Sequence, residues 1–318
     1  MMRGVILCFD TVSRGDIDLS RLKAELTGLD VFGVTAADAV AARLAGAAVA
    51  IVNKVRFDAA LLRQLDDLQL ICLTATGHDK VDLAAARANG IAVANVQDYC
   101  TASVVQHVFA LILELTTHLE EYRRLVADGA WQQSGQFNLL NFPARELAGK
   151  TFGVIGYGAL GRGVAEVARA FGMRVLVAER RGATPRGGRT AFETVLAEAD
   201  ILTLHCPLTD ATRGLIGAEE LAHMKPDALL INTARGAIVD AEALGEALGS
   251  GRLGGAGLDV LPQEPPPADD PLLARQLPNL IVTPHIAWAA REARQRVMDE
   301  IAANIRAFRA GVERNRLV

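Results

Sequence analysis

Aromatic residues, cysteines and long hydrophobic runs are all scarce in this 318-residue chain. Phe, Trp and Tyr make up only 5% of it although 51% is hydrophobic, so the core must be built mainly from Ala, Leu and Val. An aliphatic core of this kind suits helices stacked on a parallel sheet. The length allows two domains of ordinary size.

Cysteine and histidine are too scattered for a disulfide framework or a metal site. The four cysteines contain no C-x-x-C pair, and three of them, Cys8, Cys72 and Cys206, lie in or beside apolar runs. The six histidines form neither an H-x-x-x-H pattern nor a cluster with carboxylates. We expect reduced cysteines, a reducing compartment and no bound metal.

The sequence shows no targeting or membrane-spanning segment. The first ten residues hold one Arg and only five consecutive apolar residues, too few for a secretory signal. The longest uncharged run, residues 100–113, is too short to cross a bilayer. A net charge of −4 gives no basic field for nucleic acid or anionic lipid. We expect a cytoplasmic protein that binds neither.

Short apolar runs alternate with amphipathic stretches along the chain. Such a β-α-β-α rhythm predicts parallel sheets, because a crossover between parallel strands is long enough to hold a helix. Helical patterns include residues 19–26 and 83–88. The first series of expected strands is 5–9, 31–34, 48–52, 68–73 and 91–94, and the second is 151–155, 174–178, 200–204, 228–231, 255–258 and 280–283.

Two segments interrupt this rhythm. Residues 101–126 predict one long helix, apolar almost all round in its first part and therefore buried between domains or subunits. Residues 128–146 contain Trp131, Phe137 and Phe142 and are interpreted as an arm over a neighbouring molecule, so we expect a homodimer. The proline-rich residues 262–267 predict an extended loop. A last helix, 290–309, has the apolar spacing to pack on the first domain.

A glycine-rich loop, Gly156-x-Gly158-x-x-Gly161, lies between the apolar run 151–155 and the helical run 162–171. In this context the first glycine allows a tight turn, the second admits a pyrophosphate and the third lets helix and strand pack closely. The helix N-terminus offers free N–H groups to phosphate. The pattern predicts a dinucleotide site, the alternative being an ordinary strand-to-helix turn.

The next strand ends in Glu179, 18 residues after Gly161. An acidic residue there accepts hydrogen bonds from the adenosine ribose hydroxyls and repels a 2′-phosphate, which favours NAD. Arg180 and Arg181 follow at once and suit a 2′-phosphate, which keeps NADP open; the alternative is that both are simply solvated.

Three further polar residues, Arg235, Glu264 and His285, follow the ends of three strands in the second series. The carboxyl ends of parallel strands share one edge of the sheet, so we expect these side chains to converge. An arginine holds a carboxylate and polarises a carbonyl, a histidine donates a proton, and a carboxylate orients the histidine. This set suits reduction of a 2-oxo acid by a nicotinamide cofactor.

With these motifs the chain resembles the D-isomer-specific 2-hydroxyacid dehydrogenase family over nearly its whole length. The matching segments are Gly156–Gly161, His205-Cys206-Pro207-Leu208-Thr209, Asn232-Thr233-Ala234-Arg235-Gly236, Gly257-Leu258-Asp259-Val260, Glu264-Pro265 and Pro284-His285. The resemblance implies two doubly wound α/β domains: a flavodoxin-like substrate domain, residues 1–98 plus 291–318, and an inserted Rossmann NAD-binding domain, residues 99–290.

The resemblance also implies the roles of individual residues. Arg235, Glu264 and His285 would be catalytic. Thr76 and Gly77, in a loop where the family usually has glycine at the position of Ala75, would bind the substrate carboxylate with Arg235, and Trp288 would wall the pocket or merely pack. Cofactor contacts would fall on Thr101, Tyr157, Gly158, Ala159, Leu160, Glu179, Arg180, His205, Cys206, Pro207, Thr212, Thr233, Ala234, Arg235, Asp259 and His285.

Within the family, residues 74–77, 98–101 and 285–288 look most like the glycerate dehydrogenase and hydroxypyruvate reductase branch. The expected reaction is reduction of glyoxylate or hydroxypyruvate to the hydroxy acid. Alternatives are an NAD-sensing corepressor of the same fold and a phosphoglycerate or D-lactate dehydrogenase. The chain ends at Val318, and we expect no added regulatory domain.

Overall fold

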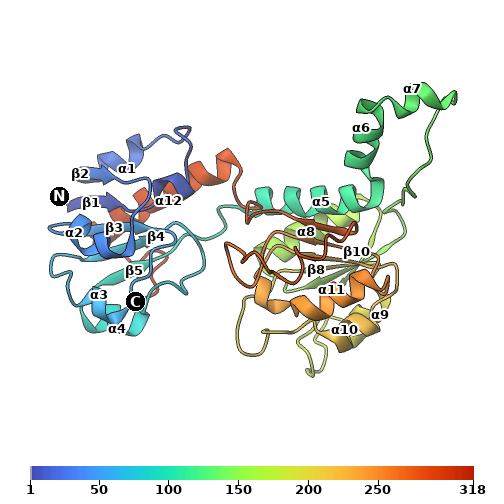
Figure 1. Ribbon diagram of the computed structural model, residues 1–318. Coiled ribbons are helices and arrows are strands. Elements are labelled where there is room, and N and C mark those ends of the chain that lie inside the picture. The colour runs from blue at the N-terminus through green and yellow to red at the C-terminus, as the bar shows by residue number, and fades with distance from the viewer. Residues whose placement is uncertain (1) are drawn as a thin grey trace. The chain divides into compact units, whose positions relative to one another are not determined.

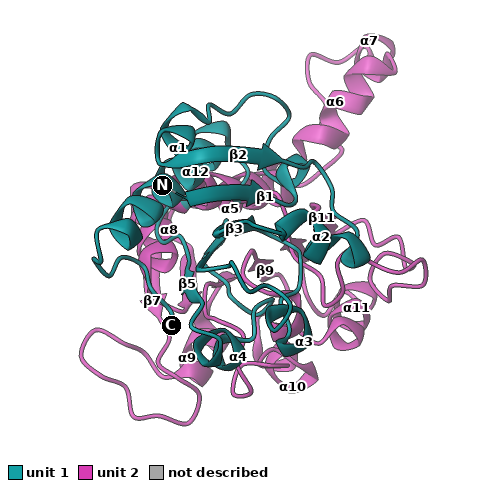
Figure 2. Cartoon of the chain, turned by 90° about the vertical axis from the view of Figure 1, so that its left-hand side faces the viewer, with its two compact units in different colours: residues 1–100, 288–318 teal, residues 101–287 magenta. Residues whose placement is uncertain are grey.

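The computed structural model describes residues 2–318, which form two compact units (Figures 1 and 2). Unit 1 contains the residues up to Cys100 together with Trp288–Val318, and unit 2 is Thr101–Ala287. The predicted domain boundaries were 98/99 and 290/291, and Met1 of the predicted first domain lies outside the described residues. Each unit is an α/β body around a parallel sheet, which confirms the predicted fold class.

Unit 1 has the strand order of a doubly wound flavodoxin-like sheet, β2-β1-β3-β4-β5, with every neighbouring pair parallel. The order reverses between β1 and β3. Its strands are β1 Met2–Ile6, β2 Leu26–Val31, β3 Val49–Val52, β4 Leu70–Leu73 and β5 Ala92–Ala94. Its helices are α1 Ser20–Ala24, α2 Val40–Leu44, α3 Ala59–Leu62, α4 Leu83–Ala88 and α12 Arg291–Arg309, with 3₁₀ turns at Phe9–Thr11 and Ala37–Ala39.

The second strand of unit 1 lies earlier in the chain than predicted. Its pairing with β1 runs from Met2 opposite Leu26 to Ile6 opposite Val31. Val34, inside the predicted strand, is 71% exposed. The position of this edge strand is therefore determined by its hydrogen bonds to β1. It could not be predicted from apolar runs, because residues 27–30 are mostly polar or glycine.

Helix α12 returns the end of the chain to the sheet of unit 1, as its apolar spacing predicted. Val297, Ile301 and Ile305 are fully buried in one cluster with β1, β3 and β4. The buried Asn304 donates its side-chain amide to the backbone oxygen of Asn95, 2.8 Å away. This cluster joins two segments that are distant in sequence into one body.

Unit 2 has the strand order β11-β10-β9-β8-β6-β7, again with all neighbours parallel. An isolated parallel bridge between Ala178 and Thr190 lies at the β7 edge of the sheet, in the place of the outer strand of a Rossmann sheet. The order reverses between β6 and β8. The strands are β6 Thr151–Ile155, β7 Arg174–Val177, β8 Ile201–Leu204, β9 Leu229–Asn232, β10 Gly255–Leu258 and β11 Leu280–Val282.

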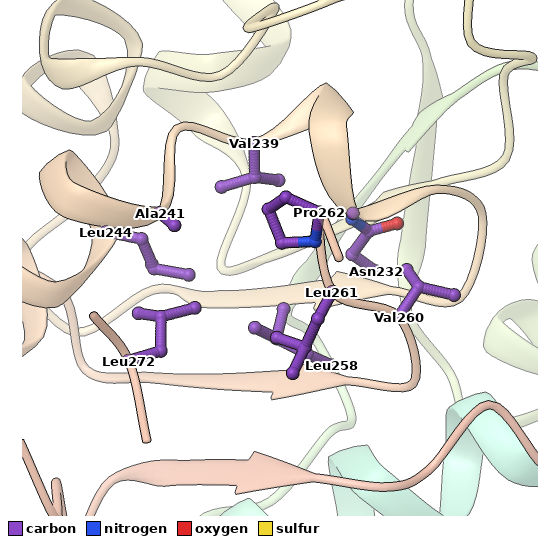
Figure 3. A pocket seen from close by; sticks show the side chains of 10 residues that line it. Asn232, Val239, Ala241, Leu244, Leu258, Val260, Leu261, Pro262 and Leu272 are labelled. Carbon is purple, nitrogen blue, oxygen red and sulfur yellow. The ribbon is translucent and has the colours of Figure 1, made fainter. Parts of the chain in front are cut away.

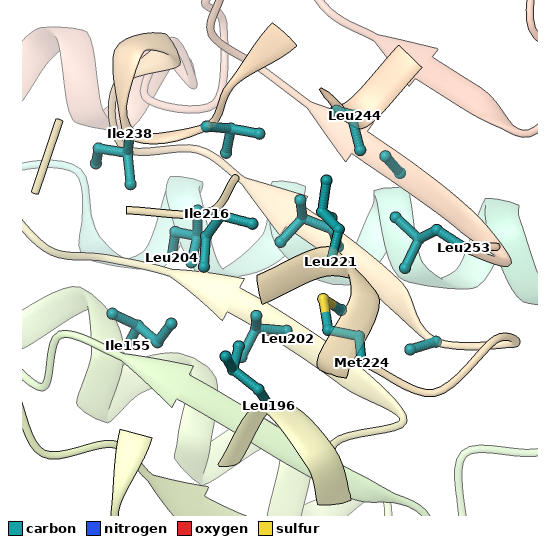
Figure 4. Close-up of a cluster of buried hydrophobic side chains, with 14 of the residues drawn as sticks. Ile155, Leu196, Leu202, Leu204, Ile216, Leu221, Met224, Ile238, Leu244 and Leu253 are labelled. Atoms are coloured by element: carbon teal, nitrogen blue, oxygen red, sulfur yellow. The ribbon is translucent and has the colours of Figure 1, made fainter. Parts of the chain in front are cut away.

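Aliphatic side chains fill the core of unit 2. Figure 4 shows Leu221 of α10 and Met224, which directly follows that helix, in one cluster with Leu202 and Leu204 of β8. Elsewhere in unit 2, Phe109 of α5 stacks on Phe152 of β6, with ring centroids 5.9 Å apart. The helices are α5 Thr101–Thr117, α6 Leu119–Ala127, α7 Ala130–Ser134, α8 Ala159–Ala170, α9 Phe192–Glu198, α10 Ala218–His223 and α11 Ala241–Gly249, with a 3₁₀ turn at Gly236–Ile238.

The prediction of one helix over 101–126 is wrong, because the chain breaks at His118. This residue is left-handed, with φ 54° and ψ 41°, and helices α5 and α6 meet at a bend of 59°. The His118 ring stacks on Phe142, with centroids 5.5 Å apart, so a tertiary contact accompanies the break. Helices α6 and α7 stand away from the body of unit 2 (Figure 1), and residues 118–146 are called the arm. The chain rejoins the body at Arg145, whose N–H donates to the oxygen of Thr116 at 2.9 Å.

Among residues 2–318, no single helix is long and apolar enough to cross a membrane, and the bent pair α5–α6 passes that test only jointly, on length and composition.

Candidate active site

The glycine-rich loop joins β6 to α8 at the point where the sheet order of unit 2 reverses. Gly156 has φ 89°, and a Cβ there would come within 2.5 Å of the backbone of His205 and Cys206. A Cβ on Gly161 would overlap the backbone oxygen of Gly156. Gly158 differs, since a Cβ there would meet nothing within 4 Å. Two glycines are thus required by packing, and the third leaves open space beside the backbone.

That open space fits the pyrophosphate of a dinucleotide. Gly158 is the N-cap of α8 and supplies no side-chain cap, so the N–H groups of the first helical turn remain for a ligand. Two buried atoms in the other matched motifs, Nδ1 of His205 and Oγ1 of Thr233, have no hydrogen-bond partner within residues 2–318. Buried polar atoms are rarely left unpaired, so they too fit a site that a ligand completes.

The acidic residue after β7 is already paired in this structure. Both oxygens of Glu179 accept from Arg186, at 2.7 Å from Nε and 2.8 Å from Nη2. The Arg186 guanidinium, and after it the Arg180 N–H at 2.9 Å, hold the pKa of Glu179 at about 2. Sequence reasoning named Arg180 and Arg181 and missed Arg186, because nothing in the spacing of an arginine-rich loop says which arginine folds back.

Arg235, Glu264 and His285 follow three strands that lie side by side, β9, β10 and β11. Nδ1 of His285 is 2.6 Å from Oε2 of Glu264. The other oxygen of Glu264 accepts from the backbone N–H of Leu261 at 3.1 Å, which fixes the carboxylate. The predicted histidine–carboxylate pair is therefore formed in the structure.

A side chain that sequence reasoning left without a role, Asn232, shapes the Arg235 loop. Its amide donates to the backbone oxygen of Arg235 at 3.0 Å, and its oxygen accepts from the N–H of Ala234 at 3.0 Å. A Cβ on Gly236 would overlap the backbone of Leu261, so the loop that carries Arg235 lies directly against the loop that carries Glu264. The Arg235 side chain is exposed, and its Nη1 donates to the oxygen of Ala234 at 2.7 Å.

Asp259 holds the turn that presents His285. It is 1% exposed, and its carboxylate accepts from Thr283 Oγ1 at 2.6 Å and from the N–H groups of Ile286 and Ala287, both at 2.8 Å. Its backbone oxygen accepts from the N–H of His285 at 2.9 Å. These bonds fix His285 in a left-handed conformation, φ 55°, which is costly for a residue other than glycine.

Helix α5 supports the same turn. His107 lies with Nε2 2.9 Å from Thr283 Oγ1 and 3.5 Å from Asp259 Oδ1. Its Nε2 thus contacts two side chains that hold the turn, and the ring is partly buried. The pairing of residues 107 and 283, far apart in sequence, could not be read from any motif.

A small pocket behind the Arg235 loop is lined almost entirely by apolar side chains (Figure 3). It contains none of the three candidate catalytic side chains, so we interpret it as a packing defect of the core. Its lining is Asn232, Gly236, Val239, Ala241, Leu244, Leu258, Val260, Leu261, Pro262 and Leu272.

In unit 1, the loop predicted to bind a substrate carboxylate follows β4. Thr76 Oγ1 donates to the backbone oxygen of Val96 at 2.8 Å, and the amide of Asn95 donates to the oxygen of Thr76 at 2.8 Å. The N–H of Val96 reaches the oxygen of Ala75 at 3.3 Å, so the loop forms with alanine at that position. Trp288, also in unit 1, packs edge-on against Tyr99, with centroids 6.3 Å apart.

Other predicted cofactor residues have visible structural neighbours. Thr212 donates to Pro207 O and accepts from Thr209 N, both at 2.7 Å, and so braces the 205–209 loop. The N–H of His205 donates to Ile155 O at 2.7 Å, which joins that loop to the end of β6. The ring of Tyr157 lies 5.6 Å from the Arg189 guanidinium. Ala159 and Leu160 form the first turn of α8, and Thr101 begins α5.

Residues 109–287 match the family model of the D-isomer specific 2-hydroxyacid dehydrogenase NAD-binding domain. The chain belongs to this family of dehydrogenases. It is 48% identical to a glycerate dehydrogenase of Methylorubrum extorquens over 273 residues, 86% of each chain. It is 34% identical to a hydroxypyruvate reductase of Blautia hydrogenotrophica over 98% of each chain.

Solved structures agree with this membership. A protein of Thermus thermophilus is 36% identical over the whole of both chains, with a TM-score of 0.86. An acyclic imino acid reductase solved with NADPH and D-Arg is 28% identical over the whole of both chains, with a TM-score of 0.84. The chain is therefore an NAD-binding dehydrogenase, and the predictions of family, enzyme class and cofactor are confirmed.

The two kinds of glycine in the loop predict two kinds of mutant. Gly161→Ala should destabilise this dehydrogenase by about 1–3 kcal/mol, because its methyl group overlaps backbone that cannot yield. Gly158→Ala should leave stability unchanged and weaken NADH binding, because its methyl group enters the open space that fits the pyrophosphate. Urea unfolding and calorimetric titration with NADH measure the two effects. Equal stability of both variants would contradict this reading of the loop.

His205 predicts an acid-sensitive contribution to stability. Burial lowers the pKa of His205 to about 4, below the 6.5 of the unfolded chain. Between pH 6.5 and pH 4, His205 is therefore protonated in the unfolded chain but not in the folded protein. Its contribution to the free energy of unfolding is complete above pH 6.5 and is lost as the pH falls toward 4. The loss is about 1–3 kcal/mol. Urea unfolding measures the free energy of unfolding at pH 7 and at pH 5. The decrease between these pH values should be smaller for His205→Asn than for His223→Asn, which removes an exposed histidine as a control. Equal decreases in the two variants would contradict the role of His205.

Proposed function

We propose that this dehydrogenase reduces hydroxypyruvate or glyoxylate to D-glycerate or glycolate with NADH or NADPH. The observation that carries the proposal is the His285–Glu264 pair at 2.6 Å on a strand end next to that of Arg235. Relatives named glycerate dehydrogenase, hydroxypyruvate reductase and glyoxylate reductase support the substrate class.

The proposed chemistry assigns one task to each of the three side chains. The Arg235 guanidinium binds the substrate carboxylate and polarises the neighbouring carbonyl. His285 donates a proton from Nε2 to the carbonyl oxygen, which becomes the hydroxyl group. Glu264 orients the ring through Nδ1 and stabilises the imidazolium. A bound reduced nicotinamide supplies the hydride.

We also propose the division of labour between the two parts of the chain. Residues 1–98 with 291–318 form the substrate domain and residues 99–290 the cofactor domain. The N–H groups of Thr76 and Gly77 hold the substrate carboxylate together with Arg235, and Trp288 contacts the rest of the substrate. In the cofactor domain, Asp259 contacts the nicotinamide carboxamide in addition to holding the His285 turn. The ordered bonding of the 74–77 loop supports its assignment.

The homodimer, predicted from both the apolar helix after Thr101 and the aromatic arm, is likewise a proposal, and it now rests on the arm alone. The apolar side of α5 is already buried within unit 2, as Val104, Val108 and Ile112 show. The arm, in contrast, exposes large apolar side chains, including Phe137 at 88% and Leu140 at 85%. Apolar surface gathered on one projecting segment is typical of an interface between subunits. We propose that a second copy of the chain covers it.

The substrate proposal is tested by steady-state kinetics with 2-oxo acids and both cofactors. We expect the highest kcat/KM with hydroxypyruvate or glyoxylate, and much lower values with pyruvate and 3-phosphohydroxypyruvate. The two poorer substrates represent the D-lactate and phosphoglycerate alternatives. Absence of NADH and NADPH oxidation with every acid would favour the sensing-protein alternative and reject the proposal.

His285→Ala should lower kcat by about 10²–10⁴ while the Kd of NADH stays within about twofold, because the proton donor is lost and the dinucleotide contacts remain. His223→Ala, which removes an exposed histidine at the end of α10, should retain full kcat. Stopped-flow turnover and calorimetric titration give the two quantities. A large loss of NADH binding in His285→Ala would place this residue in a different role.

Replacing both Phe137 and Leu140 with Asp should convert the dimer into a monomer, because charged side chains oppose burial of the arm. Multi-angle light scattering should then report the chain mass, 33.8 kDa, instead of twice that value. Val34→Asp provides the matched control, since Val34 is an apolar residue 71% exposed in unit 1. A monomeric parent protein, or a double variant that stays dimeric, would refute the arm as the interface.

A further inference from the structure

The ribose-binding carboxylate predicted from the sequence is covered by a side chain of its own loop. Glu179 has a side chain only 2% exposed, while the Arg186 side chain that contacts it is 67% exposed. The guanidinium bonds both carboxylate oxygens and has solvent on its other side. Arg186 therefore stands between Glu179 and any ligand that approaches from solvent.

This pairing affects the two forms of the cofactor differently. The ribose hydroxyls of NADH are hydrogen-bond donors and need the same carboxylate oxygens that Arg186 occupies. The 2′-phosphate of NADPH is an acceptor, and the five-donor fork of an arginine binds phosphate in the bidentate way it binds carboxylate. One arginine can therefore oppose the diol and favour the phosphate.

Two neighbouring arginines of the loop have partners other than Glu179. Arg181 pairs with Glu220 at 2.8 Å, and Arg189 donates to the backbone oxygen of Ala178 at 3.1 Å. Arg180 bonds Glu179 through its backbone N–H, and its side chain is exposed. Only Arg186, among the arginines of residues 180–189, places its guanidinium on the acidic residue itself.

The backbone around Arg186 leaves it able to move. Gly187 and Gly188 follow it directly, and Gly188 has φ 75°, a conformation that a larger residue rarely adopts. The Arg186 side chain is itself 67% exposed, so its guanidinium can turn from Glu179 into solvent without displacing a buried group. Exchange of its partner from carboxylate to phosphate therefore requires no change in the core.

We propose that Arg186 sets the balance between NADH and NADPH in this enzyme. With NADH it yields at least one oxygen of Glu179 to the ribose diol. With NADPH it turns its fork to the 2′-phosphate and screens the phosphate from Glu179. The proposal rests on the proposed dehydrogenase function and adds a specificity-determining residue to its cofactor site.

The test is direct binding, measured by calorimetric titration of NAD⁺ and NADP⁺ and of the fragments 5′-AMP and 2′,5′-ADP. Arg186→Ala should weaken NADP⁺ and 2′,5′-ADP by roughly tenfold or more, because one charge-assisted fork is lost and Glu179 then repels the phosphate. NAD⁺ and 5′-AMP should bind as tightly as before or more tightly, since the carboxylate is freed. Arg186→Lys should recover part of the loss, because it retains charge without the fork.

Arg174→Ala is the matched control, since Arg174 pairs with Glu198 at the other end of β7 and should leave all four affinities unchanged. The proposed role of Arg186 would be wrong if the ratio of NADP⁺ to NAD⁺ affinity in Arg186→Ala stayed within about twofold of the parent ratio. Equal weakening of the binding of both nucleotides would have the same meaning, and neither result would affect the proposed function. A parent protein that binds neither nucleotide would overturn the proposed function together with this inference.

Discussion

The parallel pairing of β9, β10 and β11 is the constraint on which the proposed catalytic site of this enzyme depends. Leu258 lies opposite Asn232 on one side and Val282 on the other, so three chain segments end at the same level of the sheet. A shift in this register would separate Arg235, Glu264 and His285, because each follows its strand by only a few residues. Hydrogen bonds of the backbone thus set the geometry, and the side chains only refine it.

Buried polar side chains then convert strand ends into rigid loops. Asn232 closes the turn that carries Arg235, and Asp259 closes the turn that carries His285. Both are nearly inaccessible to solvent, where an unpaired amide or carboxylate would be costly. Their bonds to backbone N–H groups hold the proposed catalytic residues in conformations, such as the left-handed His285, that local sequence does not favour.

The predicted cofactor site differs from the proposed catalytic loops, because one partner of its ion pair is exposed to solvent. Glu179 is buried and bonded through both oxygens, whereas its partner Arg186 is at the surface and, in our proposal, changes partner when NADPH binds. The glycine loop beside it is determined by close backbone contacts at Gly156 and Gly161. The proposed cofactor site therefore combines a closely packed glycine loop with a surface arginine that covers the acidic residue after β7.

The sequence by itself determined the features that depend on local chemistry. These are the two α/β series, the glycine loop with its required positions, the acidic residue after β7 and the order of Arg235, Glu264 and His285 along the chain. Each is encoded within a few consecutive residues, through apolar periodicity or through glycine at a position of close contact. The strand ranges 151–155 and 255–258 agree with the structure for the same reason.

Only the tertiary structure decided what depends on contacts between distant segments. The break at His118, the position of β2, the support of Asp259 by Thr283 and His107, and the pairing of Glu179 with Arg186 all fall in this class. Several arginines of one loop are equivalent in sequence, and a polar edge strand resembles a loop. Their places are set by which partner the fold brings within hydrogen-bond distance, a property of the assembled chain that no short segment contains.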